Sequence, residues 1–383
     1  MTTATPRRFL AHLYQEGPHN PFPGIKALER RLGHALPHQY GSNEGLDMPH
    51  AVLGGELGHA LADLSRSYAD ADAWQLRHQL AERLGVAYET LLVDAGADSL
   101  LALVMRATIC AGERVITSAG TYPTLAYFAR GLGAEVIEVP YTEAHASDDA
   151  LHFAQLAPDL AALAAAASQH AARVVYLANP DNPSGHLHSD EDVRALRDAL
   201  PADCSLLLDE AYHDFRPDAA QADNAPMART FRLRTFSKAY GLAGLRLGFM
   251  IAEREDLALL TKVRIHYAVS APALAAGELL LKHPEEAATH VAAVIQSRDQ
   301  LAEHLRSLGA DVLPSATNFL CVRLKSAERA AQVQQQLMAQ GVLITRSPHP
   351  ALGHILRIST LEDSLVPGRL ARLEQAIVEE NRA

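Results

Sequence analysis

From Asp94 onward, the 383-residue chain alternates short apolar runs with longer stretches of helix-forming residues. Each apolar run is bounded by turn residues, which is typical of buried strands. The strands predicted in this way are Arg114–Thr117, Glu135–Val139, Arg173–Ala178, Ser205–Leu208, Thr230–Thr235 and Leu247–Ile251. Strands that alternate with helices favour an α/β fold, in which helices cover both faces of a mostly parallel sheet.

Helices are predicted between these strands. Ser189, with Glu191 and Asp192 close behind it, is a suitable helix start because its hydroxyl can accept a bond from a free N–H group of the first turn. The Ala-rich stretch Leu156–Ala172 contains no glycine and therefore favours a helix over a flexible linker. The predicted helices are a run beginning near Ser99, Thr121–Gly131, Leu156–Ala172, Ser189–Leu200 and a long passage over Ala273–Leu308.

The length of the chain indicates two lobes, because one hydrophobic core usually stops growing at about 250–300 residues. Two further apolar runs, Asn318–Leu324 and Val342–Thr345, follow the long helical passage and are predicted strands of a second, smaller lobe. We predict the boundary between the lobes near residue 270.

Composition narrows the classes of function. The formal net charge is -11 and no cluster of lysines and arginines occurs, so a nucleic-acid partner is not expected. Cys110, Cys204 and Cys321 lie far apart and lack the paired spacing of a disulfide framework or a metal site. Residues 1–17 lack the apolar core of a signal peptide and no apolar run reaches about 18 residues, so we expect a cytoplasmic protein without a membrane span.

Lys238 follows two hydroxyl residues, Thr235 and Ser237, at the end of an apolar run. A lysine that faces a cleft at a strand end is partly desolvated, which lowers its pKa and makes its neutral amine available to a carbonyl group. Arg246, eight residues further on, can hold a phosphate with two parallel hydrogen bonds. Considered alone, the Ser-Lys pair would more often be a solvated surface feature.

Asp209 ends another apolar run abruptly. In an open parallel sheet, ligands bind at the carboxyl ends of the strands, so the Asp209 side chain is expected to point into that crevice. A carboxylate there can hold a pyridine nitrogen protonated by raising its pKa. Tyr212 can then donate to an oxygen on the same ring. The structural alternative makes Asp209 a helix N-cap and Tyr212 a packing residue.

Two segments rich in turn residues follow other predicted strands. Ala178–Gly185 contains two prolines, which stiffen the backbone and can hold the amide of Asn182 toward a ligand. Asp94–Leu100 precedes a helical run, so the backbone N–H groups at its start can bind an anion. Either segment alone predicts no more than a turn.

Together these segments resemble fold-type I pyridoxal-phosphate enzymes, and within them the histidinol-phosphate aminotransferase group. The matching segments span nearly the whole chain and include Ser42–Glu44, Tyr68–Arg77, Gly96–Asp98, Thr121–Tyr122, Asn179–Gly185, Asp209–Tyr212, Ser237–Lys238, Thr317–Phe319 and Leu356–Ser359. The resemblance implies a large domain at 51–270, a small domain at 271–383, and a segment 1–50 that forms an N-terminal arm and part of the small domain. It also implies a homodimer with shared active sites.

The resemblance further implies a role for each matched residue. Lys238 binds pyridoxal 5'-phosphate as a Schiff base and moves the proton at the substrate α-carbon, while Asp209 pairs with the pyridine nitrogen. Arg357, with Asn182 beside it, binds a substrate carboxylate or a similar anion, which suits the planar fork of an arginine. The remaining cofactor contacts are Asn182 and Tyr212 at the ring oxygen, Tyr122 stacked on the ring, Ala97, Asp98, Thr235, Ser237 and Arg246 at the phosphate, and Tyr68 from the partner subunit.

Two departures from the family pattern bear on the substrate. After Asn43-Glu44 this chain has Gly45-Leu-Asp-Met-Pro49 where the family usually has Asn-Pro-x-Gly, so the N-terminal part of the substrate pocket is expected to be remodelled. The arginine expected after the Gly-Val-Leu strand stands at Arg346, one position further along. A phosphate-bearing substrate would require that arginine.

The implied reaction is amino transfer from an amino acid or amino-alcohol phosphate to a 2-oxo acid, with histidinol phosphate and 2-oxoglutarate as the first pair to test. One alternative keeps the fold and the cofactor but is a decarboxylase or another activity, because the outcome depends on which bond at the α-carbon lies perpendicular to the ring. A second alternative is a non-catalytic relative that binds the cofactor, against which the presence of Lys238 and Asp209 argues. The competing structural interpretation makes Tyr68 and Tyr122 core aromatics, Arg246 part of an ion pair and Arg357 a surface charge.

Overall fold

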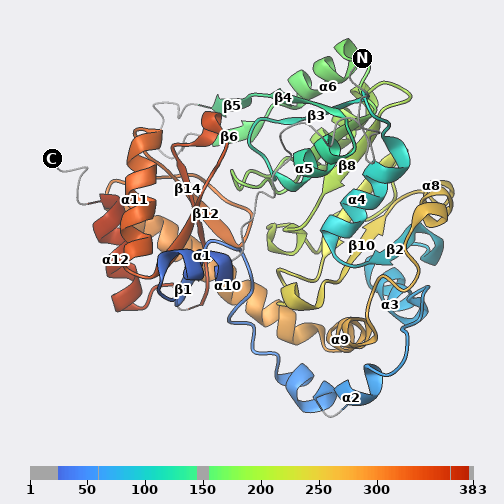
Figure 1. Cartoon of the computed structure of the whole chain (residues 1–383), viewed down its shortest axis with the longest axis horizontal. Helices are drawn as coiled ribbons and strands as arrows, with labels where there is room; N and C mark the ends of the chain where they lie inside the picture. Colours follow the sequence, from blue (N-terminus) through green and yellow to red (C-terminus); the bar gives the residue numbers. More distant parts are fainter. Residues whose placement is uncertain (1–24, 59, 145–154, 363, 379–383) are drawn as a thin grey trace, which may run out of the picture.

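The computed structural model of the chain describes residues 25–58, 60–144, 155–362 and 364–378. Two sheets with covering helices lie next to one another (Figure 1). Residues 1–24, which hold the segment compared with a signal peptide and about half of the predicted N-terminal arm, lie outside the described ranges. No helix within those ranges has the length and apolar character needed to cross a bilayer.

The larger sheet has seven strands in the order β2-β10-β9-β8-β7-β3-β4. Their bounds are β2 Leu91–Asp94, β3 Arg114–Ser118, β4 Glu135–Val139, β7 Val174–Ala178, β8 Ser205–Asp209, β9 Thr230–Thr235 and β10 Gly248–Ile251. All neighbours pair in parallel except β10, which is antiparallel to both β9 and β2. The mostly parallel sheet is therefore confirmed, and each predicted strand is confirmed to within one residue.

Helices cover both faces of this sheet. The strand β7 illustrates the arrangement, because its side chains alternate between two apolar clusters: Val174 and Tyr176 join the cluster under α4, α5 and α8, while Val175 and Leu177 join the cluster under α6 and α7. The helices are α4 Ala97–Thr108, α5 Thr124–Gly131, α6 Leu160–Gln169, α7 Asp190–Ala199 and α8 Arg254–Leu260.

The start of α7 confirms the role predicted for Ser189. The Ser189 side chain accepts a hydrogen bond from the Asp192 backbone N–H, and the Asp192 side chain accepts one from the Ser189 N–H, so a capping box forms. Helix α4 begins two residues before Ser99. Helix α5 begins three residues later than predicted, after Pro123, whose fixed backbone is suited to the start of a helix.

The prediction of one helix over Leu156–Ala172 is wrong at its start. Residues Gln155–Pro158 form β6, which pairs antiparallel with β5 Tyr141–Ala144. Pro158 disfavours a helical conformation in the residue before it, which keeps this part of the chain extended. Helix α6 begins only after Asp159, whose side chain accepts a bond from the Ala162 N–H group.

The long helical passage predicted over Ala273–Leu308 is confirmed, and it is divided into two helices that meet at His283. They are α9 Ala271–Lys282 and α10 Pro284–Ser307. His283 has φ of -121° and ψ of 61°, outside the helical region, as the residue before a proline prefers. Helix α9 packs against α3 Trp74–Leu84, on the side of the larger sheet. The domain limits at 50 and 270 remain predictions.

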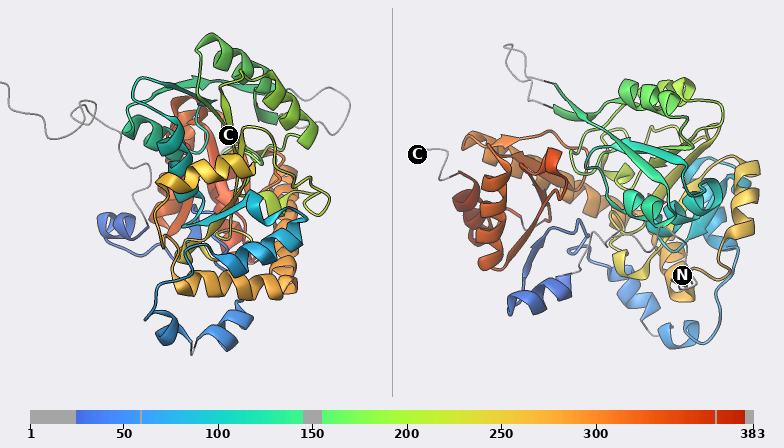
Figure 2. Two further views of the ribbon diagram at one scale, coloured as in Figure 1. Left: turned by 90° about the vertical axis from the view of Figure 1, so that its right-hand side faces the viewer. Right: turned by 45° about the horizontal axis from the view of Figure 1, so that its top comes forward.

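The smaller sheet has the order β1-β13-β14-β12-β11. Its strands are β1 His38–Tyr40, β11 Asp311–Val312, β12 Phe319–Arg323, β13 Val342–Arg346 and β14 Ile355–Ser359, and its helices include α1 Ile25–Leu32, α11 Ala327–Ala339 and α12 Pro367–Val378. The strands predicted at β12 and β13 are confirmed to within one residue. Strand β1 pairs with β13, so the blue N-terminal segment lies beside the orange and red C-terminal elements (Figure 2).

Candidate active site

Three loops that carry predicted site residues meet at one edge of the larger sheet. The strands β7, β8 and β9 are parallel, so their carboxyl ends lie together. Asn182 follows β7, Asp209 ends β8 and Lys238 follows β9. Strand β2 runs in the same direction as β9, because both are antiparallel to β10, and it brings the start of α4 to this edge. The topology thus explains why residues far apart in the chain face one space.

A cavity of about 190 Å³ lies at this edge of the sheet. Its wall contains every residue predicted to bind the cofactor from within one subunit. The lining residues are Ser42, Glu44, Ala97, Asp98, Tyr122, Ala178, Pro180, Asn182, Asp209, Ala211, Tyr212, Thr235, Ser237, Lys238, Ala243 and Arg246.

The carboxylate of Asp209 is buried at the floor of this site. Tyr176 Oη donates a 2.7 Å bond to Oδ2, and the Ala211 backbone N–H donates a 3.0 Å bond to Oδ1. Burial raises the pKa of Asp209 to about 6 despite these two donors. Among the ion pairs of the described residues, none includes Asp209, so this carboxylate is suited to bind a cationic ring nitrogen.

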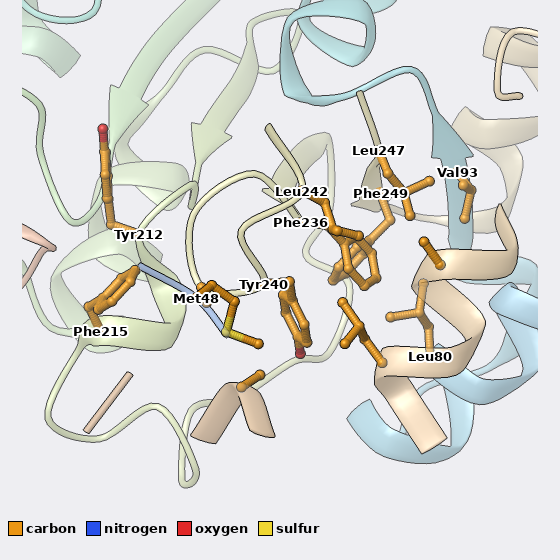
Figure 3. Packing of buried hydrophobic residues seen from close by; sticks show 14 of the residues in the cluster. Met48, Leu80, Val93, Tyr212, Phe215, Phe236, Tyr240, Leu242, Leu247 and Phe249 are labelled. Carbon is orange, nitrogen blue, oxygen red and sulfur yellow. The ribbon is translucent and has the colours of Figure 1, made fainter. Parts of the chain in front are cut away.

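Lys238 is held over the cavity by its neighbours in the loop. Phe236 and Tyr240 flank it and are buried in an apolar cluster with Phe249, as Figure 3 shows. Lys238 itself lines the cavity, where its Nζ donates a 3.3 Å bond to the Ser42 carbonyl oxygen. Burial, together with the positive charge of Arg357, lowers the pKa of Lys238 to about 8. The amine is therefore available as a nucleophile and a base near neutral pH.

One end of the cavity is suited to a phosphate. The N–H groups in the first turn of α4 have no partner within the helix, and Thr235 Oγ1 lies 2.9 Å from Ser237 Oγ. Arg246 reaches the same end, with Nη2 3.4 Å from Asp98 Oδ2. Gly96 has φ of 85°, and a Cβ there would lie 3.0 Å from Arg246 Nη2, so glycine permits the close approach of the guanidinium.

Arg357, on β14, is a buried guanidinium beside the cavity, contrary to the interpretation as a surface charge. Its Nη1 donates a 2.6 Å bond to Asn182 Oδ1, and its Nη2 donates a 2.6 Å bond to the Gly41 carbonyl oxygen. Its Nε is buried without a hydrogen-bond partner, and no carboxylate among the described residues pairs with it. A buried cation with spare donors is suited to bind an anion.

Two tyrosines from different parts of the fold line the cavity. Tyr122, at the start of the α5 segment, donates from Oη to Asp98 Oδ1 at 2.9 Å. Tyr212, after β8, is buried, and its phenol oxygen points away from the apolar cluster in Figure 3. Asn43 Nδ2 donates to this phenol oxygen at 2.9 Å.

Tyr68 and Arg346 do not line the cavity. Tyr68 is 85% exposed and stacks on Tyr267 with 4.9 Å between ring centroids, so it is not a core aromatic residue. Arg346 lies on β13 beside Gly353, and its neighbour Thr345 is the residue that faces Arg357 and Gly41.

The segment Gly41–Glu44 forms part of the site, a role that was not predicted from the sequence, although Ser42–Glu44 matched the family pattern. Each residue of this segment touches the site: Gly41 accepts a bond from Arg357, Ser42 from Lys238, Asn43 donates to Tyr212, and Glu44 lines the cavity. Gly45, the first residue that departs from the family pattern, also lies close to the site. A Cβ on Gly45 would lie 2.8 Å from the Lys238 carbonyl oxygen, so only glycine permits this path.

Comparison with known proteins agrees with this geometry. The family model for aminotransferase class I and II matches residues 40–372. The histidinol-phosphate aminotransferase of Anaeromyxobacter sp. (strain Fw109-5) is 33% identical over 81% of this chain and 82% of its own length. An aromatic amino acid aminotransferase of Nocardia farcinica is 34% identical over 74% of this chain and 77% of its own length.

A solved structure resembles the whole chain. It is the histidinol-phosphate aminotransferase from Sinorhizobium meliloti in complex with pyridoxal-5'-phosphate, which has a TM-score of 0.88 and 32% identity and covers 99% of this chain and 100% of that one. The buried carboxylate, the lysine and the phosphate-binding end of the cavity fit this cofactor. The chain therefore belongs to the aminotransferase class I and II family, the transaminases of fold type I, and its cofactor is pyridoxal 5'-phosphate.

Proposed function

We propose that this aminotransferase takes the amino group from an amino acid or an amino-alcohol phosphate and passes it to a 2-oxo acid. One observation carries the proposal: three charged side chains face one site, and none of them pairs with an opposite charge among the described residues. Lys238 can bind the cofactor, Asp209 can pair with its ring nitrogen, and Arg357 can bind an anionic group of the substrate.

The catalytic role falls to Lys238. When bound, pyridoxal 5'-phosphate supplies an aldehyde for amines and a protonated ring that withdraws electrons from the α-carbon. Asp209 would hold the proton on the ring nitrogen. Lys238 would carry the cofactor at rest and, as a neutral amine, would move the proton from the substrate α-carbon to the cofactor. A pKa of about 8 leaves a useful neutral fraction at neutral pH.

The other lining residues would position the cofactor. Asn182 and Tyr212 would bind the ring oxygen, and Tyr122 would stack on the ring. The phosphate would bind between the first turn of α4 and the side chains that face it, namely Ala97, Asp98, Thr235, Ser237 and Arg246.

The donor would be clamped by Arg357. Relatives of this chain are histidinol-phosphate and aromatic amino acid aminotransferases, so histidinol phosphate and aromatic amino acids are the first donors to compare, with 2-oxoglutarate as the acceptor. Arg346 remains a predicted phosphate contact. If it has that role, Arg346→Gln raises KM for histidinol phosphate and leaves KM for an aromatic amino acid unchanged.

The test is conversion of the bound cofactor to its amine form, followed by absorbance as each donor is added. The wild type is expected to convert with at least one donor and to return on addition of 2-oxoglutarate. Lys238→Ala should lose the reaction, whereas Lys325→Ala, at an exposed position, should keep it. Release of carbon dioxide without amine transfer would favour a decarboxylase, and a bound cofactor that no donor converts would favour a non-catalytic relative.

We also propose a homodimer in which Tyr68 reaches the phosphate of the partner's cofactor. The segment that carries α2 Leu61–Leu64 protrudes from the body of the chain (Figure 1). It displays apolar and aromatic side chains on its surface, and Tyr267 stacks on Tyr68 beside it. Large exposed side chains of the segment around α2 and of the segment around Tyr267 are Leu61 at 51%, Tyr68 at 85%, Ile265 at 63% and Tyr267 at 51%. Exposed apolar side chains of this size are typical of a subunit interface. A native mass of one chain, measured by light scattering with full activity, would contradict this proposal.

A further inference from the structure

Asn43 connects the last strand of the smaller sheet to the tyrosine of the active site. The Asn43 backbone N–H donates to Ser359 Oγ at 2.9 Å, and Ser359 Oγ donates to Asn43 Oδ1 at 2.5 Å. Asn43 Nδ2 then donates to Tyr212 Oη at 2.9 Å. All three side chains are buried, with 1% of Asn43, 1% of Ser359 and 5% of Tyr212 exposed.

The donors and acceptors assign a direction to each hydrogen bond between Asn43, Ser359 and Tyr212. A serine hydroxyl has one hydrogen, and Ser359 accepts the backbone N–H of Asn43, so its own hydrogen goes to Asn43 Oδ1. The amide of Asn43 must therefore present its NH2 group to Tyr212. Because the phenol oxygen accepts this bond, the phenol hydrogen remains available to another acceptor, and Tyr212 lines the cavity.

The opposite orientation of the amide is unfavourable. If it were turned over, Ser359 Oγ would receive two N–H donors, and its own hydrogen would be buried without an acceptor. A buried donor without a partner costs about 1–3 kcal/mol. The backbone supports the same geometry, because Asn43 adopts φ of 54°, a left-handed conformation that asparagine tolerates better than most residues. Asn318 Nδ2 also donates to the Asn43 carbonyl oxygen at 3.2 Å.

We propose that Asn43 and Ser359 are positioning residues that make Tyr212 a hydrogen-bond donor to the ring oxygen of the cofactor. The inference rests on the proposed function, in which Tyr212 contacts that oxygen. A donated hydrogen bond stabilises the ionised form of the ring oxygen and lowers the pH at which the absorption of the bound cofactor changes. Burial raises the pKa of Tyr212, so the phenol keeps its hydrogen at neutral pH. The smaller sheet thereby sets the electronic state of a cofactor that the larger sheet binds.

The test is a pH titration of the bound cofactor's absorption band in the holoenzyme. Tyr212→Phe and Ser359→Ala should each move the midpoint upward by about one pH unit, the size expected for one hydrogen bond. In the double variant the midpoint should equal that of Tyr212→Phe alone, because both changes remove the same bond. Ser297→Ala, which removes a buried hydroxyl bonded to the Leu361 carbonyl oxygen, should keep the wild-type midpoint.

A wild-type midpoint in Ser359→Ala would overturn the inference, and so would a shift that adds to that of Tyr212→Phe. If Ser359→Ala does not fold, Asn43→Asp serves instead, since both of its carboxylate oxygens accept and Tyr212 must then donate to Asp. Its upward shift should be smaller in the Tyr212→Phe background, where only the added negative charge acts, and an equal shift there would overturn the inference. A wild type that binds no cofactor would contradict the proposed function. A midpoint that does not move in Ser359→Ala contradicts only the positioning role of Asn43 and Ser359.

Discussion

Arg357 Nη1 donates a 2.6 Å hydrogen bond to Asn182 Oδ1, joining β14 of the smaller sheet to the loop after β7 of the larger one. The guanidinium thus holds both a loop of the site and, as proposed, the substrate anion. Arg357→Lys keeps the charge but loses the planar fork. We expect KM for the amino donor to rise by about tenfold to a hundredfold, the cost of one or two charge-assisted hydrogen bonds. Arg194→Lys, at a surface ion pair, should leave KM unchanged.

The pKa of Lys238 predicts how the apoenzyme captures its cofactor. Only the neutral amine attacks an aldehyde, and neutral amine accumulates as the pH rises through about 8. The rate of capture should therefore rise about tenfold from about pH 7 to about pH 9, with its midpoint near 8. Stopped-flow absorbance measures this rate. In Arg357→Gln the midpoint should move to higher pH, because Arg357 lowers the pKa of Lys238, and an unmoved midpoint would contradict that assignment.

Asp209 is expected to reduce the stability of the apoenzyme at neutral pH. Its pKa is about 6 in the folded chain against 3.8 in the unfolded one, so its contribution to stability is complete below 3.8 and is lost as the pH rises through 6. Asp209→Asn should raise the free energy of unfolding of the apoenzyme by about 1–3 kcal/mol at about pH 8 and change it little near about pH 4. Urea unfolding measures both values. With cofactor bound, the wild type should be the more stable protein.

Glu210, next to Asp209, has the opposite character. It lies between Arg232 and Arg234, with contacts of 2.8 Å and 3.0 Å, and all three side chains are buried. Although burial alone would raise the pKa of Glu210, the two arginines hold it well below its usual range. Glu210→Gln leaves two buried guanidinium groups without a counter-charge and should lower the free energy of unfolding by about 3–5 kcal/mol.

The control for this change is Glu303→Gln on the exposed face of α10, which should have an effect within about 0.5 kcal/mol. The contribution of Glu210 is present above the unfolded pKa of 4.5 and decreases as the pH falls. The difference between Glu210→Gln and the wild type should therefore shrink in acid. A difference that grows in acid would contradict the assignment.

Shared active sites predict recovery of activity in mixed dimers. Tyr68→Ala and Lys238→Ala should each have low activity as homodimers. In a mixed dimer, one site combines Lys238 from one subunit with Tyr68 from the other and is intact. Random mixing should restore about a quarter of wild-type activity, since about half of the dimers are mixed and each has one intact site. Recovery that is absent after subunit exchange, shown by differential tagging, would contradict the sharing.

The sequence predicted the central strands well because each is a continuous apolar run between turn residues. Strand β1 lacked this signal, because it has three residues, of which only Tyr40 is buried. Strand β2 was not predicted although its four residues, Leu-Leu-Val-Asp, are all buried. The late start of α6 and the break between α9 and α10 had local signals that composition obscured, since Pro158 and Pro284 both interrupt stretches rich in helix formers. Alternation of strands and helices was sufficient to predict the sheet.

The cavity could be predicted in large part, because its residues end or follow recognisable strands. The contribution of Gly41 and Ser42 could not, since both act through carbonyl oxygens that any residue would supply. The role of Asn43 depends on a partner 316 positions away, and no local pattern reports such a contact. Contacts between residues far apart in the sequence therefore account for most of the site that was not predicted.

The separation of Asn43 from Ser359 has a consequence for biosynthesis. During translation, residues 41–44 leave the ribosome early, while β14, which holds both Arg357 and Ser359, follows more than three hundred residues later. A nascent chain can complete the larger sheet and expose Lys238 before Arg357 and Ser359 have been synthesised. Tight enclosure of the cofactor site must therefore wait until synthesis is nearly finished.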